Sequence, residues 1–113
     1  YGNRVPMARF LRDDESFIAA PAAGAGIELG MHGHLGPNGA RGSPRNLSRM
    51  GRRAVTGHTH SAGIVGDVWT VGLMAHQDLG YNRGPSSWSA TFCVVHDNGA
   101  CQLVTIWNGK FRA

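Results

Sequence analysis

Gly57-His58-Thr59-His60 follows a short apolar run, and a second histidine pair, His32-Gly33-His34, lies upstream at the end of another apolar run. Both pairs are therefore expected where a strand passes into a loop. Side chains two residues apart on an extended backbone point to the same side, so His58 and His60 are predicted to face a shared point. Imidazole is a common ligand for zinc, iron and nickel, and for manganese when carboxylates are also present. The spacing thus predicts a metal site.

The size and composition set limits on the fold. A chain of 113 residues makes one domain at most. Its 17 glycines are about twice the usual frequency, which predicts many turns and loops rather than long helices. No apolar run approaches the roughly 18 residues that span a bilayer, so no membrane association is expected.

The charge is unevenly distributed. The formal net charge is +4, and no acidic residue lies between Glu28 and Asp67. The same interval holds the arginines at positions 41, 45, 49, 52 and 53. A basic segment between two histidine motifs favours a phosphate-bearing ligand. The simpler alternative is the solvated face of a helix.

Whether the two cysteines can form a disulfide depends on the turn between them. A two-residue hairpin turn at Asn98-Gly99 would pair positions 97 and 100 and set Cys93 and Cys101 too far apart for a disulfide. Two free thiols and a reducing cytoplasm are therefore expected, although a disulfide in a secreted protein is the alternative.

Local patterns predict the elements. Ser43 is a suitable N-cap, Pro44 suits the first helical position, and Gly51 is placed to end the helix. The three tryptophans fall in expected strands and are assigned to the core. Strands are expected at 16–20, 27–31, 54–56, 63–65, 68–71, 88–96, 100–107 and 110–112. We therefore expect an α/β fold whose C-terminal half is an antiparallel meander.

The ordered motifs resemble those of the calcineurin-like metallophosphoesterases. The two histidine loops are followed by the stretch at 84–88 and by Asn98-Gly99, and the likeness extends from Gly30 to Arg112. The string at 30–43 is similar to a branch common in tailed bacteriophages. The resemblance implies the C-terminal half of a metallophosphoesterase-like β-sandwich with flanking helices.

The motifs that this superfamily carries upstream are absent from the chain. There is no Asp-x-His, no Gly-Asp-x-x-Asp and no Gly-Asn-His-Asp or Gly-Asn-His-Glu. Residues 1–113 are accordingly expected to form a single partial domain, and a start at Tyr1 fits a fragment or one piece of a split protein. An N-terminal half or a second chain is expected to supply the missing ligands.

The resemblance also assigns roles to individual residues. It implies that His32 and His58 bind one divalent metal ion and His60 a second, with manganese, zinc, iron or nickel as the metal. His34 is placed next to substrate as a candidate acid, while His76 and His96 are expected to be ordinary surface or hairpin residues. The candidate substrate-binding residues are Asn38, Gly39, Arg41 and Arg45, with Arg41 and the amides of 39–42 as a phosphate cradle.

The leading hypothesis is a two-metal phosphodiesterase or nuclease in which activated water attacks in line with the leaving oxygen and Arg41 holds the phosphate. Its expected partner is a phosphodiester, with nucleic acid first, in the cytoplasm of a bacterium or phage-infected host cell. A noncatalytic nucleic-acid or phosphate-binding module is the second hypothesis. A structural fragment stabilised by one zinc ion is the third.

Overall fold

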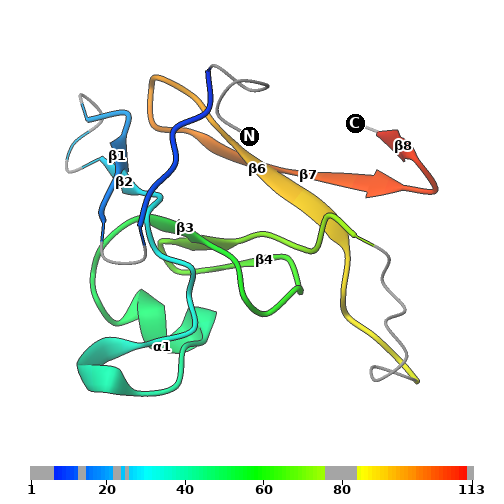
Figure 1. Ribbon diagram of the computed structural model, residues 1–113, viewed down its shortest axis with the longest axis horizontal. Helices are drawn as coiled ribbons and strands as arrows, with labels where there is room; N and C mark the ends of the chain where they lie inside the picture. The colour runs from blue at the N-terminus through cyan, green and yellow to red at the C-terminus, as the bar shows by residue number, and fades with distance from the viewer. Residues whose placement is uncertain (1–6, 13–14, 22–23, 25, 76–83, 112–113) are drawn as a thin grey trace.

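The computed structural model of the chain contains two β-sheets and a single α-helix in the residues that it describes (Figure 1). The described residues are 7–12, 15–21, 24, 26–75 and 84–111. The predicted α/β class agrees with this arrangement at a coarse level.

The first sheet has the strand order β1-β2-β3-β5-β4. Its strands β2 and β3 are parallel, with Glu28 opposite Ala54, and β3 and β5 are also parallel. β1 and β4 lie antiparallel to their neighbours. The strands are β1 (Ile18–Ala19), β2 (Ile27–Glu28), β3 (Ala54–Thr56), β4 (Gly63–Val65) and β5 (Val68–Thr70). Because β2 and β3 are parallel, the segments that follow them leave the sheet at the same edge.

The second sheet is an antiparallel ladder of β6 (Ala90–Val95), β7 (Cys101–Trp107) and β8 (Lys110–Phe111). Figure 1 shows β6 and β7 as the longest strands, crossing above the first sheet in this view. The two sheets are joined where β5 ends, because the Gly72 amide donates to the Thr91 carbonyl over 2.8 Å. The guanidinium of Arg53 makes a second link, to the Gly99 carbonyl at 2.5 Å.

The crossover between β2 and β3 contains the 3-10 turn η1 (Pro37–Gly39) and the helix α1 (Pro44–Ser48). The helix begins as the sequence predicts, since the Ser43 side chain accepts a hydrogen bond from the Asn46 amide. Leu47 is only 1% exposed and belongs to the core of the first sheet, with Ile27, Ala54 and Val68. The helix therefore anchors the crossover against the sheet.

Two glycines bring the crossover close to the first histidine loop. A Cβ atom on Gly42 would overlap the carbonyl oxygen of Gly33. Gly33 itself has φ +105 and lies beside Thr56, the last residue of β3. Glycine is needed at position 42 because only a residue without a side chain allows the two backbones to approach so closely.

Several predicted strands are confirmed and others are corrected. Strands β3 and β4 have the predicted limits, and β5 is one residue shorter than predicted. β2 ends at Glu28 and does not continue to residue 31, so it does not deliver His32 directly. The predicted antiparallel meander is present in β6, β7 and β8 but does not cover the whole C-terminal half, because β5 pairs with β3 and β4 pairs with β5 in the first sheet.

The hairpin between β6 and β7 has a different register from the predicted one. Val95 pairs with Cys101, and the turn is closed by a hydrogen bond from the His96 amide to the Ala100 carbonyl. The loop therefore has three residues, with Gly99 at φ +83, rather than two. The shift of one position brings Cys93 and Cys101 to the same face of the ladder, which corrects the predicted separation.

The two thiols are not joined to each other. Burial raises the pKa of the Cys93 thiol to about 11, and the neighbouring Cys101 adds to the rise.

The prediction of a buried Trp107 is wrong, since this side chain is 69% exposed. In the part of the chain that the structure describes, no helix is both long and apolar enough to span a bilayer.

Glu28 ties the N-terminal segment to the first sheet. Its residue is 4% exposed, and its carboxylate accepts hydrogen bonds from the Ser16 hydroxyl, the Phe17 amide and the Gly30 amide. Burial would raise the pKa of Glu28, but these hydrogen bonds together hold it below its ordinary value. A lowered pKa in the folded state stabilises the fold above the ordinary pKa of the group, and the contribution is lost as pH falls through the folded value.

We expect Glu28→Ala to lower the free energy of unfolding by about 1–3 kcal/mol at pH 7, because two backbone amides lose their acceptor. Urea unfolding at several pH values measures the effect. The difference between wild type and variant should shrink as pH falls through the folded pKa of Glu28. A difference that does not change with pH would contradict a role for the ionised carboxylate.

We expect Gly42→Ala to destabilise the fold by about 1–3 kcal/mol, because the added methyl group overlaps the Gly33 carbonyl. Gly63→Ala is the matched control, since a Cβ atom at position 63 meets nothing within 4 Å. Thermal unfolding of both variants provides the comparison. Equal melting temperatures for the two variants would show that the crossover can move away from the histidine loop at little cost.

Candidate functional site

The two histidine loops are held together by backbone hydrogen bonds at one edge of the first sheet. The Gly57 amide donates to the His32 carbonyl over 2.9 Å, directly beyond the parallel pair β2 and β3. The Gly42 amide donates to the His34 carbonyl over 2.8 Å. The loops after β2 and β3 and the crossover therefore meet at one place.

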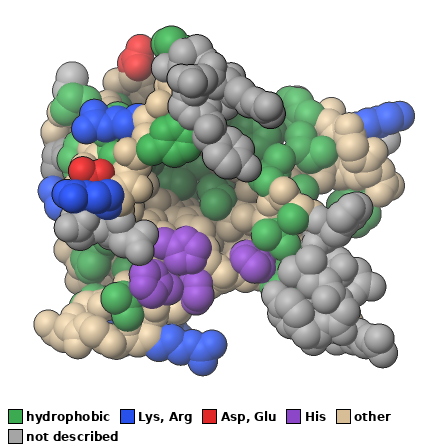
Figure 2. All heavy atoms as spheres, in the orientation of Figure 1, with side chains coloured by type: hydrophobic (Ala, Val, Ile, Leu, Met, Phe, Trp, Pro, Cys, Tyr) green, Lys and Arg blue, Asp and Glu red, His purple; other side chains and the backbone are tan. Residues whose placement is uncertain are grey.

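Three imidazoles gather there. The ring centroids of His32 and His58 are 5.1 Å apart, those of His32 and His34 are 5.5 Å apart, and those of His34 and His58 are 6.1 Å apart. Nε2 of His32 and Nδ1 of His58 are 3.2 Å apart, within hydrogen-bond distance. We call these three residues the histidine cluster. All three are exposed, and Figure 2 shows histidine side chains gathered below a hollow in the surface.

His60 lies apart from the histidine cluster. Its ring packs edge-on against Trp88 with 4.5 Å between centroids, and its carbonyl accepts a hydrogen bond from the Ser89 amide. The prediction that His58 and His60 converge assumed an extended backbone, and the loop does not have that conformation. His58 has φ +73 and His60 has φ +60, so the loop turns between them. The structure brings His34, rather than His60, next to His32 and His58.

The charge around His58 favours its neutral form. Desolvation by the surrounding atoms lowers the pKa of the exposed His58, and neighbouring groups that carry positive charge lower it further, in the order His32, His34, His60 and Arg41. A neutral imidazole has a free lone pair, which is the form that binds metal. The local electrostatics therefore suit a ligand that loses its proton readily.

The histidine cluster does not by itself have the arrangement of a metal site. Over the described ranges, no three or more His, Cys, Asp or Glu side chains are arranged so that they could hold a metal ion. The hydrogen bond between His32 and His58 uses one lone pair that a metal would need. An ion bound there would have to replace this hydrogen bond with bonds to both nitrogens.

The predicted phosphate cradle is only partly available. The Ala40 amide donates to Pro37 and the Gly42 amide to His34, so neither is free for an anion. Arg41 and Arg45 are exposed, and Arg41 is close enough to influence the pKa of His58. Asn38, at φ +58, and Gly39, at φ +77, form the exposed tip of the η1 turn. Arg41 is thus the residue of this loop whose charge affects the pKa of His58.

Other arginines in the basic segment have different surroundings. Arg53 lies 5.2 Å from the centre of the Trp69 ring and bonds to Gly99, so it has a structural role between the sheets. Arg49 and Arg52 are exposed. The prediction for His96 is confirmed, because it is an exposed residue of the hairpin, whereas His76 lies outside the described residues.

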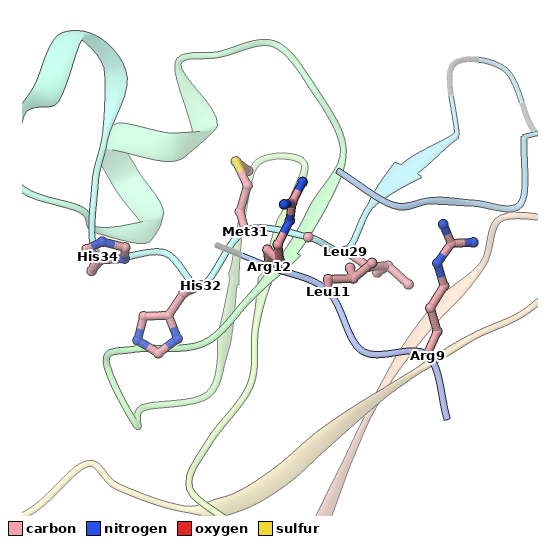
Figure 3. A pocket seen from close by; sticks show the side chains of 8 residues that line it. Arg9, Leu11, Arg12, Leu29, Met31, His32 and His34 are labelled. Atoms are coloured by element: carbon pink, nitrogen blue, oxygen red, sulfur yellow. The ribbon is translucent and has the colours of Figure 1, made fainter. Parts of the chain in front are cut away.

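A pocket that the sequence did not indicate adjoins the histidine cluster. It has a volume of about 300 Å³ and its lining includes Arg9, Leu11, Leu29, Met31, His32 and His34 (Figure 3). The segment at 7–12 has no regular structure, so periodicity gave no sign of its position. Trp88 was predicted to be a core residue within a strand, but it precedes β6, is half-buried and packs against His60.

The chain is similar to Protein A1 of Escherichia phage T5, with 46% identity over 106 residues. These residues are 94% of this chain but 18% of the phage protein, so the chain spans less than a fifth of that relative's length. A phage relative fits the resemblance to a bacteriophage-type branch, but the relative's name indicates no metallophosphoesterase. No family model and no solved structure matches the chain.

We expect the His58 imidazole to titrate below its ordinary pKa in metal-free protein, and Arg41→Ala to raise that pKa by removing a nearby positive charge. NMR titration of the imidazole protons measures both effects. Lys110→Ala, which removes a cation from β8, serves as the control. An unchanged His58 titration in Arg41→Ala would contradict the position of Arg41 beside the histidine cluster.

Proposed function

We propose that this chain is the histidine-bearing part of a metal-dependent phosphoesterase that cleaves phosphodiesters, with nucleic acid as the substrate class. The observation that supports the proposal most directly is the meeting of His32, His34 and His58 at one sheet edge, with centroid separations of 5.1–6.1 Å. These histidines come from two loops that are separate in the sequence and are joined by the Gly57–His32 hydrogen bond.

Within this proposal, His32 and His58 hold a divalent metal ion and His34 lies at its side. The bound metal would polarise the phosphoryl oxygens and lower the pKa of water. Arg41, which is exposed beside the histidine cluster, attracts the phosphate and offers donors to its nonbridging oxygens. His34, whose ring centroid is 5.5 Å from that of His32, is proposed to exchange a proton with the leaving oxygen.

A second metal requires ligands beyond the histidine cluster. His60 leaves it and packs on Trp88, so it reaches a second ion only if that ion lies toward β6. Carboxylates complete two-metal centres of this kind, and within the described residues no Asp or Glu joins these histidines in a group that could hold a metal ion. We therefore assign the carboxylates to an N-terminal half of the protein or to a second chain.

We expect manganese-stimulated hydrolysis of bis-p-nitrophenyl phosphate by the full-length protein that contains this chain. His32→Ala and His58→Ala should each lower kcat/KM by about 100-fold or more, since even residues that only support metal ligands cost 10–100-fold. His96→Ala, in the exposed hairpin, should leave activity unchanged.

Retained activity in both cluster variants would reject the assignment.

A second function is favoured by the exposed arginines at positions 41, 45, 49 and 52, which fit a noncatalytic nucleic-acid-binding module. Salt-dependent binding of DNA without metal-stimulated turnover, measured on the same preparations, would support that function instead of hydrolysis.

A further inference from the structure

The pocket beside the histidine cluster has a defined arrangement along its length. Leu11, from the N-terminal segment, and Leu29, from the segment after β2, both line it. Figure 3 shows these two side chains in the middle of the view, between Arg9 at one end and His32 and His34 at the other. Met31 also contributes to the lining. Arg12, labelled beside Leu11 in Figure 3, lines the pocket as well, so the lining combines apolar side chains with two arginines and two histidines.

This arrangement restricts the chemistry of an occupant. The volume of about 300 Å³ is at the lower end of the range for small-molecule sites. No acidic side chain is among the lining residues. Arg9, which lines the pocket, is exposed, and its guanidinium lies 5.0 Å from the centre of the Phe17 ring. A ligand with a flat apolar part and an attached anion matches these features.

We propose that the pocket binds the nucleobase of the nucleotide adjoining the phosphate at the histidine cluster. The inference rests on the proposed function and extends it from phosphodiesters in general to nucleic acid read at one base. The base lies between Leu11 and Leu29, its phosphate lies at His32 and His34, and the neighbouring phosphate lies near Arg9.

Binding of a base in this pocket requires that the base is not stacked in a duplex. A base enters a pocket of this kind only after it leaves the stack of a duplex, which costs a few kcal/mol for a paired base and less for an unpaired one. Apolar and cationic contacts with a base depend little on its identity. We therefore infer a preference for single-stranded segments or chain ends, with little sequence selectivity.

The first test measures binding, without metal, by the full-length protein that contains this chain. The probes are a short single-stranded oligonucleotide with one 2-aminopurine and the same oligonucleotide with an abasic site at that position. We expect the wild type to bind the base-containing strand about tenfold more tightly. Leu11→Ser and Arg9→Ala should reduce this ratio toward one.

Matched controls are available on the same segment and elsewhere. Met7→Ser removes an apolar side chain that is 95% exposed and does not line the pocket, and Lys110→Ala removes an exposed cation from β8. Both should keep the wild-type ratio. Leu11 and Arg9 lie in an irregular surface segment, so their variants are expected to fold, and circular dichroism verifies this.

The second test measures hydrolysis with manganese. We expect Leu11→Ser to lower the ratio of kcat/KM for thymidine 5′-p-nitrophenyl phosphate to kcat/KM for bis-p-nitrophenyl phosphate, which has no base, by about tenfold. If no protein hydrolyses either compound but the binding ratio is present and is lost in Leu11→Ser, the proposed function fails and the pocket assignment stands.

Two results would overturn the pocket assignment while leaving the phosphoesterase in place. One is hydrolysis by a wild type that binds the abasic and base-containing strands equally. The other is an unchanged binding ratio in both Leu11→Ser and Arg9→Ala. Tighter binding of duplex than of single strand would also contradict the proposal.

Discussion

The hydrogen bond from the Gly57 amide to the His32 carbonyl is the constraint on which the site depends. It continues the parallel pairing of β2 with β3 past the end of both strands, at the point where each chain segment becomes a loop. Because the strands are parallel, a long crossover must separate the two histidine motifs in the sequence. The same pairing brings them into contact in space. Without it, His32 and His58 would belong to unrelated loops.

The crossover contributes more than a connection. Ser43 and Leu47 fix α1 against the sheet, and Gly42 meets Gly33 so closely that no side chain fits between them. Arg41, next to that contact, is consequently placed beside the histidine cluster although the loop around it is exposed. The packing of the crossover therefore determines that a positive charge lies near the imidazoles.

Local signals in the sequence predicted the elements that depend on local chemistry. The Ser43 cap and the limits of β3 follow from residues next to each other, and both predictions are confirmed. The register of the β6–β7 hairpin was wrong because Asn98-Gly99 suits a three-residue loop as well as a two-residue one. The prediction for His60 failed because side chains two residues apart share a side only on extended backbone. No residue type in this loop indicates that the backbone turns there.

The left-handed backbone at His58 and His60 has a consequence for how such a loop persists over generations. Glycine adopts this conformation without steric cost, whereas a residue with a side chain is strained there by on the order of 1–3 kcal/mol. Selection for folding alone would favour glycine at both positions. Thermostable variants selected without screening for activity would therefore tend to lose these two imidazoles first.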